Sequence, residues 1–108
     1  MKNTLTLNVG LNRNTGGTVS AADVRREIAR HARIVKSAIH QSDTEATLVC
    51  QIDAPSHKSP CRRLCKQFAQ DCVAVVKNGR GELVGPKAAQ WSPFNPAYFL
   101  QLDGKRMG

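Results

Sequence analysis

Apolar residues in this sequence switch between the two-residue period of a strand and the longer period of a helix. In residues 4–11 (TLTLNVGL) every second residue is apolar, as in a strand that is buried on one face. In residues 61–69 (CRRLCKQFA) apolar residues recur at i, i+3, i+4, i+7 and i+8, which predicts an amphipathic helix. The chain therefore contains both kinds of element, and their order predicts the fold.

Capping residues indicate where two helices begin. Ser20 is followed three residues later by Asp23, which resembles a capping box. Ser59 and Pro60 supply an N-cap and a first helical residue for the second helix. The first helix has one apolar face, formed by Ala21, Val24, Ile28 and Ala32.

Segments rich in β-branched residues predict further strands between and after the helices. They lie at residues 34–40, 46–53, 72–76 and 82–84, and Asn78-Gly79 is a hairpin turn signal. The resulting β-α-β-β-α-β order predicts a ferredoxin-like α+β fold, in which two helices cover one face of an antiparallel sheet. A short extra strand follows.

The length of 108 residues predicts a single domain. We expect an α+β core at residues 1–84 and an irregular, aromatic C-terminal segment at 85–108. The first thirty residues contain no continuous apolar run, which predicts neither secretion nor membrane insertion and favours the cytoplasm.

Basic residues dominate the charge of the chain. Sixteen Lys and Arg against eight Asp and Glu give a formal net charge of +8, which favours an acidic partner such as nucleic acid, an acidic protein surface or anionic lipid. If both helices lie on one side of the sheet, their outer faces form a single cationic surface. Its residues are Arg26, Arg30, Arg33, Arg62, Arg63 and Lys66. The alternative is an ordinary solvated face.

Four cysteines invite three chemical interpretations. His57, Cys61, Cys65 and Cys72 are residue types that bind zinc, but Cys61 and Cys65 share the apolar stripe of their helix, which favours core packing and no metal. Without an export signal we expect reduced thiols rather than disulfides. Cys61 lies in the first helical turn beside arginines, which keeps a cysteine enzyme as an alternative.

The glycine-rich segment at residues 10–18 (GLNRNTGGT) lies between a predicted strand and a predicted helix. Its spacing differs from that of a P-loop and it lacks the lysine. An ordinary turn with glycines at positive φ is the favoured interpretation. An anion site formed by Arg13, Gly16 and Gly17 is the alternative.

The C-terminal segment contains four aromatic residues, Trp91, Phe94, Tyr98 and Phe99. The first interpretation is that Trp91, Phe94 and Phe99 close over the domain's own core. The alternative is a second interface, for a partner or a homodimer, because aromatic residues are frequent interface anchors. Monomer and homodimer both stay open.

Four segments together, LNVGLNRNTGGTVSAADV, SDTEATLV, QDCVAVV and GPKAAQWSPFNPAYFL, resemble small uncharacterised proteins of bacteriophages and prophages. The resemblance implies an accessory protein that is made inside a bacterium and binds a host component. We therefore expect a non-catalytic binding protein without a cofactor, such as an inhibitor, whose basic helical face docks on an acidic host protein or nucleoprotein complex. The alternatives are a non-specific nucleic-acid-binding protein and a small cysteine-dependent enzyme.

Overall fold

A computed structural model of the chain describes residues 4–13, 15–41, 45–54, 58–70, 72–77, 80–86, 91–94 and 99–106. The elements in chain order are β1 (Thr4–Gly10), α1 (Ala21–Ala29), β2 (Arg33–Gln41), β3 (Ala46–Asp53), α2 (Lys58–Gln67), β4 (Val73–Lys77), β5 (Arg80–Val84) and β6 (Trp91–Phe94).

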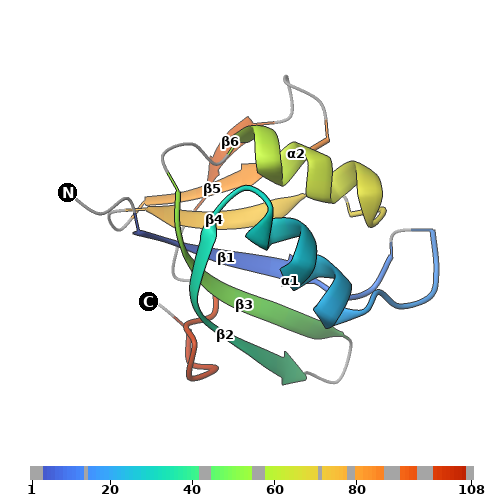
Figure 1. The fold of residues 1–108 in the computed structure, drawn as a ribbon, viewed down its shortest axis with the longest axis horizontal. Coiled ribbons are helices and arrows are strands. Elements are labelled where there is room, and N and C mark those ends of the chain that lie inside the picture. Colours follow the sequence, from blue (N-terminus) through green and yellow to red (C-terminus); the bar gives the residue numbers. More distant parts are fainter. Residues whose placement is uncertain are drawn as a thin grey trace.

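The strands form one antiparallel sheet in the order β2-β3-β1-β4-β5-β6. Both helices lie on the same face of this sheet (Figure 1). The prediction of an α+β fold with an antiparallel sheet and two helices is therefore confirmed. Because β6 joins the sheet beyond β5, the order of the whole sheet differs from the ferredoxin-like sheet with one short extra strand that we expected.

Several boundaries differ from the sequence predictions, and those of the two helices bear on the predicted basic surface. Helix α1 ends at Ala29, so Arg33 begins β2 instead of lying on the helix; the β-branched Ile34 and Val35 that follow favour a strand. Helix α2 begins at Lys58, so Ser59 is not its N-cap. Pro60 still lies in the first turn, where its missing N–H breaks no helical hydrogen bond.

The C-terminal segment is less irregular than predicted, because residues 91–94 form β6. This strand pairs with β5, and Pro93 lies opposite Glu82. Among the described residues β6 is an outer strand of the sheet. Proline is tolerated in such a strand, where one edge needs no ladder hydrogen bond.

The main core lies between the sheet and the helices. The alternation in β1 buries Leu5, Leu7 and Val9, each at most 1% exposed, and β3 places Ile52, Cys50 and Leu48 directly opposite them. The helices complete this cluster with buried apolar residues that include Val24, Ile28, Cys61, Leu64 and Cys65.

A second, smaller buried region lies on the other face of the sheet. Val49 and Ala74 are buried there, on either side of Asn8 in the register. The Asn8 amide donates to Leu100 O at 3.1 Å and accepts from Leu100 N at 2.8 Å. Residues 99–106 therefore cover this face, and the buried Phe99 belongs to them.

The same covering segment is held at β2 by His40, whose Nε2 lies 2.7 Å from Leu102 O. Gly104 has φ +86°, and a Cβ there would lie 2.8 Å from His40 Nδ1. Only glycine combines this backbone conformation with such a close approach. His40 and Gly104 therefore fix the path of the segment across β2.

Candidate functional site

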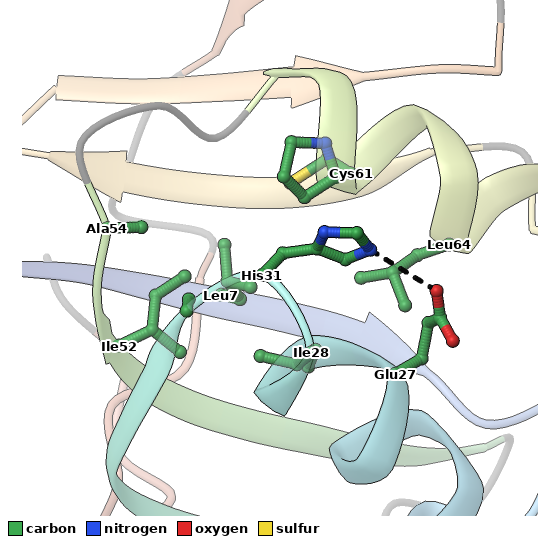
Figure 2. Close-up of a pocket in the computed structure, with 10 residues that line it drawn as sticks. Leu7, Glu27, Ile28, His31, Ile52, Ala54, Cys61 and Leu64 are labelled. Atoms are coloured by element: carbon green, nitrogen blue, oxygen red, sulfur yellow. Dashed lines mark ion pairs between the residues drawn. The ribbon is translucent and has the colours of Figure 1, made fainter.

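A pocket of about 300 Å³, including the solvent at its mouth, lies between the end of α1 and the start of α2 (Figure 2). Its apolar floor comes from the sheet, and its polar lining residues are Glu27 and His31. His31 Nε2 lies 3.4 Å from Glu27 Oε1. Its ten lining residues are Leu7, Glu27, Ile28, His31, Ala32, Ile52, Ala54, Pro60, Cys61 and Leu64.

Cys61 and His31 thus line one pocket, which sequence reasoning did not connect because they belong to different elements. Cys61 is 1% exposed. Burial, together with Cys65 and Glu82, raises the pKa of Cys61 from 9.0 to about 12, against a smaller opposing effect of Arg62. A nucleophilic cysteine needs a lowered pKa. Burial therefore favours the protonated thiol of Cys61 at neutral pH.

Two other thiols, Cys50 and Cys65, are also buried. The predicted core packing of Cys61 and Cys65 is confirmed, since both are buried, and Cys65 Sγ donates to Val84 O at 3.2 Å. Burial raises the pKa of Cys50 to about 11, although Arg25 opposes this. Cys72 is only half-buried, and none of the four cysteines forms a disulfide.

The residues that were considered as zinc ligands form no metal-binding group within the described part of the chain. Among those residues no group of three or more His, Cys, Asp or Glu side chains is placed to hold a metal ion. His57 lies outside the described residues.

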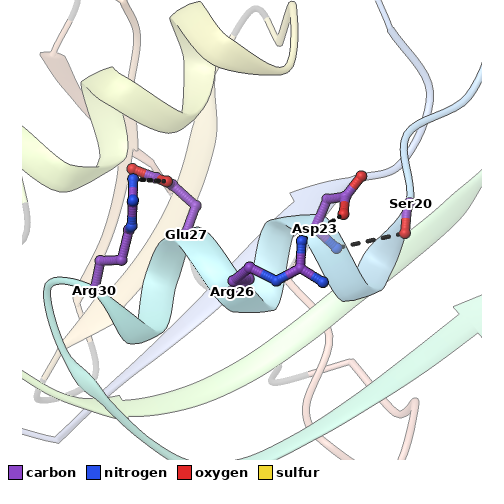
Figure 3. A network of polar contacts seen from close by, with 5 residues as sticks. All are labelled: Ser20, Asp23, Arg26, Glu27 and Arg30. Carbon is purple, nitrogen blue, oxygen red and sulfur yellow. Dashed lines mark hydrogen bonds and ion pairs between the residues drawn. The ribbon is translucent and has the colours of Figure 1, made fainter.

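The basic residues of α1 have carboxylates beside them (Figure 3). Arg26 lies 3.2 Å from Asp23, and Arg30 lies 3.4 Å from Glu27. The two arginine side chains are 75% and 72% exposed, so they face solvent as predicted. Their charges are nevertheless largely matched within the same helix.

Arg33 differs from the helical arginines, because it lies in β2. Its guanidinium is 3.6 Å from Asp53 on the neighbouring strand β3. The structure therefore does not place Arg33 on the outer face of α1, where the helical periodicity predicted it.

The basic residues of α2 have no such matching within their helix. Its ten residues, KSPCRRLCKQ, include four basic residues and no acidic one. Arg63 and Lys66 are exposed, and neither forms an ion pair with any other described residue. Arg62 is half-buried. Since α1 and α2 lie side by side, the unmatched charge of the helical layer is concentrated on α2.

The glycine-rich segment has the geometry of a turn, as the favoured interpretation predicted. Gly16 and Gly17 have φ of +98° and +85°. Arg13 N donates to Gly17 O at 2.9 Å, and Gly16 N donates to Arg13 O at 3.0 Å. Two of the N–H groups that an anion would need are therefore already used inside the turn.

The aromatic C-terminal residues are only partly described. Phe99 is 5% exposed, so it packs in the domain's own interior, as the first interpretation predicted, and is not an exposed interface residue. Tyr98 and the side chains of Trp91 and Phe94 lie outside the described residues. No sequence pattern indicates the contacts that hold this segment, Asn8 with Leu100 and His40 with Leu102, because the paired residues are far apart along the chain.

Comparison with known proteins gives no relative: no family model matches the chain, no curated protein is significantly similar to it, and no solved structure matches it. In the described residues no helix is both long and apolar enough to cross a membrane.

Proposed function

We propose that this is a non-catalytic binding protein that docks the basic surface of α2 on an acidic surface of another protein. The observation that carries the proposal is the pair Arg63 and Lys66, both exposed and both without an ion pair in the described part of the chain. Such unmatched cations attract and orient an acidic partner.

The charge pattern of α2 has a cost to the helix itself. Arg62 and Lys66 are four residues apart and Arg63 and Lys66 are three apart, and like charges at these spacings destabilise a helix by about 0.2–0.5 kcal/mol per pair. Helix α1 avoids this cost with Asp23 and Glu27. Helix stability therefore does not explain the basic residues of α2, which supports a role in binding.

An acidic protein fits better than a nucleic acid that is read by its bases. Sheets of this kind bind single strands by stacking bases on aromatic residues of the open face. Here residues 99–106 lie on that face, with Leu100 bound to Asn8. Nucleic acid would be limited to phosphate contacts by the same basic residues, which is the second candidate.

The proposal also includes a fold family for part of the sheet and a cellular location for the protein. We infer that β1 to β4 with the two helices form a ferredoxin-like unit, a proposal supported by the neighbour order β2-β3-β1-β4. The resemblance to small phage and prophage proteins supports a partner in the bacterial cytoplasm and an inhibitory role. The buried, protonated Cys61 thiol supports a function without catalysis.

The proposal is tested by capture from a nuclease-treated bacterial lysate with three double charge reversals. Arg63→Glu/Lys66→Glu should lower recovery of a specific partner at least tenfold, whereas Arg26→Glu/Arg30→Glu should lower it less. The matched control Arg80→Glu/Lys105→Glu changes two exposed basic residues outside the helices and should leave recovery unchanged. Circular dichroism melting shows that each variant is folded.

Two results would contradict this function. The first is equal recovery by the α2 variant and the control. The second is loss of all capture after nuclease treatment, together with binding of labelled DNA or RNA. In that binding, log K should fall with log salt with a slope that corresponds to contacts with several phosphates. That result would favour the nucleic-acid-binding protein.

A further inference from the structure

We propose that the outer edge of β2 binds an extended, acidic segment of another protein as an added strand. Strand β2 has nine residues and is the longest strand of the described sheet. Within the described residues it pairs only with β3 and lies at the end of the strand order. An edge strand presents unpaired N–H and C=O groups, to which an extended segment can bind.

The exposed apolar side chains of the molecule coincide with this edge. Val35 and Ile39 are 41% and 49% exposed, and they are the exposed large hydrophobic residues among those described. Both belong to β2. In strand addition the backbone supplies affinity and exposed alternate side chains supply specificity. An added strand would cover both side chains.

The geometry of β2 limits where the added strand can pair. The register with β3 shifts between Ile34 and Lys36, so Val35 is the extra residue of a bulge. From Lys36 to Gln41 the register is continuous. Residues 99–106 contact β2 at His40, so we place the added strand along residues 36–39, with Val35 at its end.

Charge selects the occupant of this edge. The strand sequence RIVKSAIHQ contains no acidic residue, and the exposed Lys36 forms no ion pair in the part of the chain that the structure describes. Arg25 reaches from α1 to Ser37 Oγ at 3.5 Å, adding a second cation above the strand. A second copy of this chain would bring the same positive charges, so the matching occupant is a segment with Asp or Glu.

The β2 edge is separate from the α2 surface. Helix α2 packs over β4 and β5, whereas β2 is at the other end of the sheet (Figure 1). The inference therefore does not depend on the proposed function, and variants of one surface serve as controls for the other. An edge lysine can also act only to prevent aggregation, and that role predicts no peptide binding.

The test is selection of the full-length protein against a displayed library of random nonapeptides. Enriched peptides should alternate Asp or Glu with Val, Ile or other apolar residues. A synthetic peptide of the enriched sequence should bind Ile39→Asp at least tenfold more weakly than the wild type. Lys36→Glu should reverse the selection toward Lys and Arg. Arg63→Glu/Lys66→Glu, in the α2 surface, should bind the same peptide unchanged.

The backbone readout is amide hydrogen exchange with the selected peptide bound, which should slow exchange within residues 36–39. Three results would overturn the inference: no enrichment over the naive library, an unchanged preference in Lys36→Glu, or protection only outside β2. Sedimentation velocity tests the other occupant. A concentration-dependent dimer that is lost in Ile39→Asp would show that a second copy of this chain, and not an acidic segment, binds the β2 edge.

Discussion

At the scale of single residues, a cysteine that shares a pocket with a histidine can act in catalysis or pack in the core, and the burial of the thiol decides between the two. Cys61 and His31 line one pocket, and Glu27 lies beside His31. A thiol enzyme needs a thiolate, but burial raises the pKa of Cys61 to about 12, so the protonated form prevails at neutral pH. Cys61 is therefore best understood as a core residue that contacts a pocket.

This burial predicts an alkaline loss of stability. The pKa of Cys61 is about 12 in the folded protein against 9.0 when exposed, so above pH 9 the unfolded chain releases a proton that the folded chain keeps. The free energy of unfolding should therefore be unaffected below pH 9 and fall toward pH 12, by about 1.4 kcal/mol per pH unit for this thiol. Urea titrations at stepped pH measure the slope.

Cys61→Ala is the control for this slope, because lysines and Cys50 also titrate in the alkaline range. Between pH 9 and 12 the free energy of unfolding of the variant should fall less steeply than that of the wild type, and the difference in slope should correspond to the release of one proton. Identical slopes for the two proteins would mean that Cys61 ionises normally in the folded state.

At the scale of elements, the two helices differ in their acidic residues: α1 has carboxylates beside its basic residues, and α2 contains none. In α1 the first-turn Asp23 lies near the positive end of the helix dipole, and Ser20 caps the N-terminus. In α2 the first turn contains no acidic residue. The cap and the first-turn carboxylate therefore favour α1 locally, in addition to its buried Val24 and Ile28, whereas α2 has no acidic residue in its first turn.

The cap of α1 predicts a measurable loss of stability. Ser20 Oγ accepts a hydrogen bond from Asp23 N at 3.4 Å. Ser20→Ala leaves this N–H without its acceptor and should lower the free energy of unfolding by about 0.5–1 kcal/mol, the lower part of the range for such caps because the bond is long. Ser20→Asp should restore it. If denaturant unfolding shows no difference between wild type and Ser20→Ala, the cap contributes nothing.

Sequence periodicity predicted most elements but not where each one ends. The helical spacing around Val24 and Ile28 continues toward Arg33 without a glycine or proline to stop it, so the sequence could not show that Arg33 belongs to β2. The segment expected to be irregular at residues 85–108 contains β6, because an outer strand accepts Pro93. Both differences arise because tertiary position, not local propensity, decides these residues.

At the scale of the whole molecule, the first strand and the C-terminal segment meet on the face of the sheet that the helices leave open. Asn8 in the central strand β1 binds Leu100, 92 residues away. Local patterns predicted the α+β class because each strand and helix has its own period. They could not predict this contact, or the unmatched charge of α2, because both depend on which distant residues the fold brings near.

The contact between Asn8 and Leu100 predicts how firmly the C-terminal segment is held. Asn8→Ala removes one donor and one acceptor and should lower the free energy of unfolding by about 2 kcal/mol at any pH, from two hydrogen bonds of about 1 kcal/mol each. Asn8→Asp keeps the acceptor, but at pH 7 its carboxylate faces the Leu100 carbonyl without a hydrogen to donate.

The two variants should therefore separate with pH. At about pH 4 or below the carboxyl group introduced by Asn8→Asp is protonated and can both donate and accept. The stability deficit of this variant relative to wild type should then shrink, while that of Asn8→Ala stays constant. Urea unfolding at pH 7 and pH 4 measures both deficits. Wild-type stability in both variants would show that the Asn8 hydrogen bonds contribute nothing, and that residues 99–106 are held on the sheet by other contacts, such as the burial of Phe99 and the contact of His40 with Leu102.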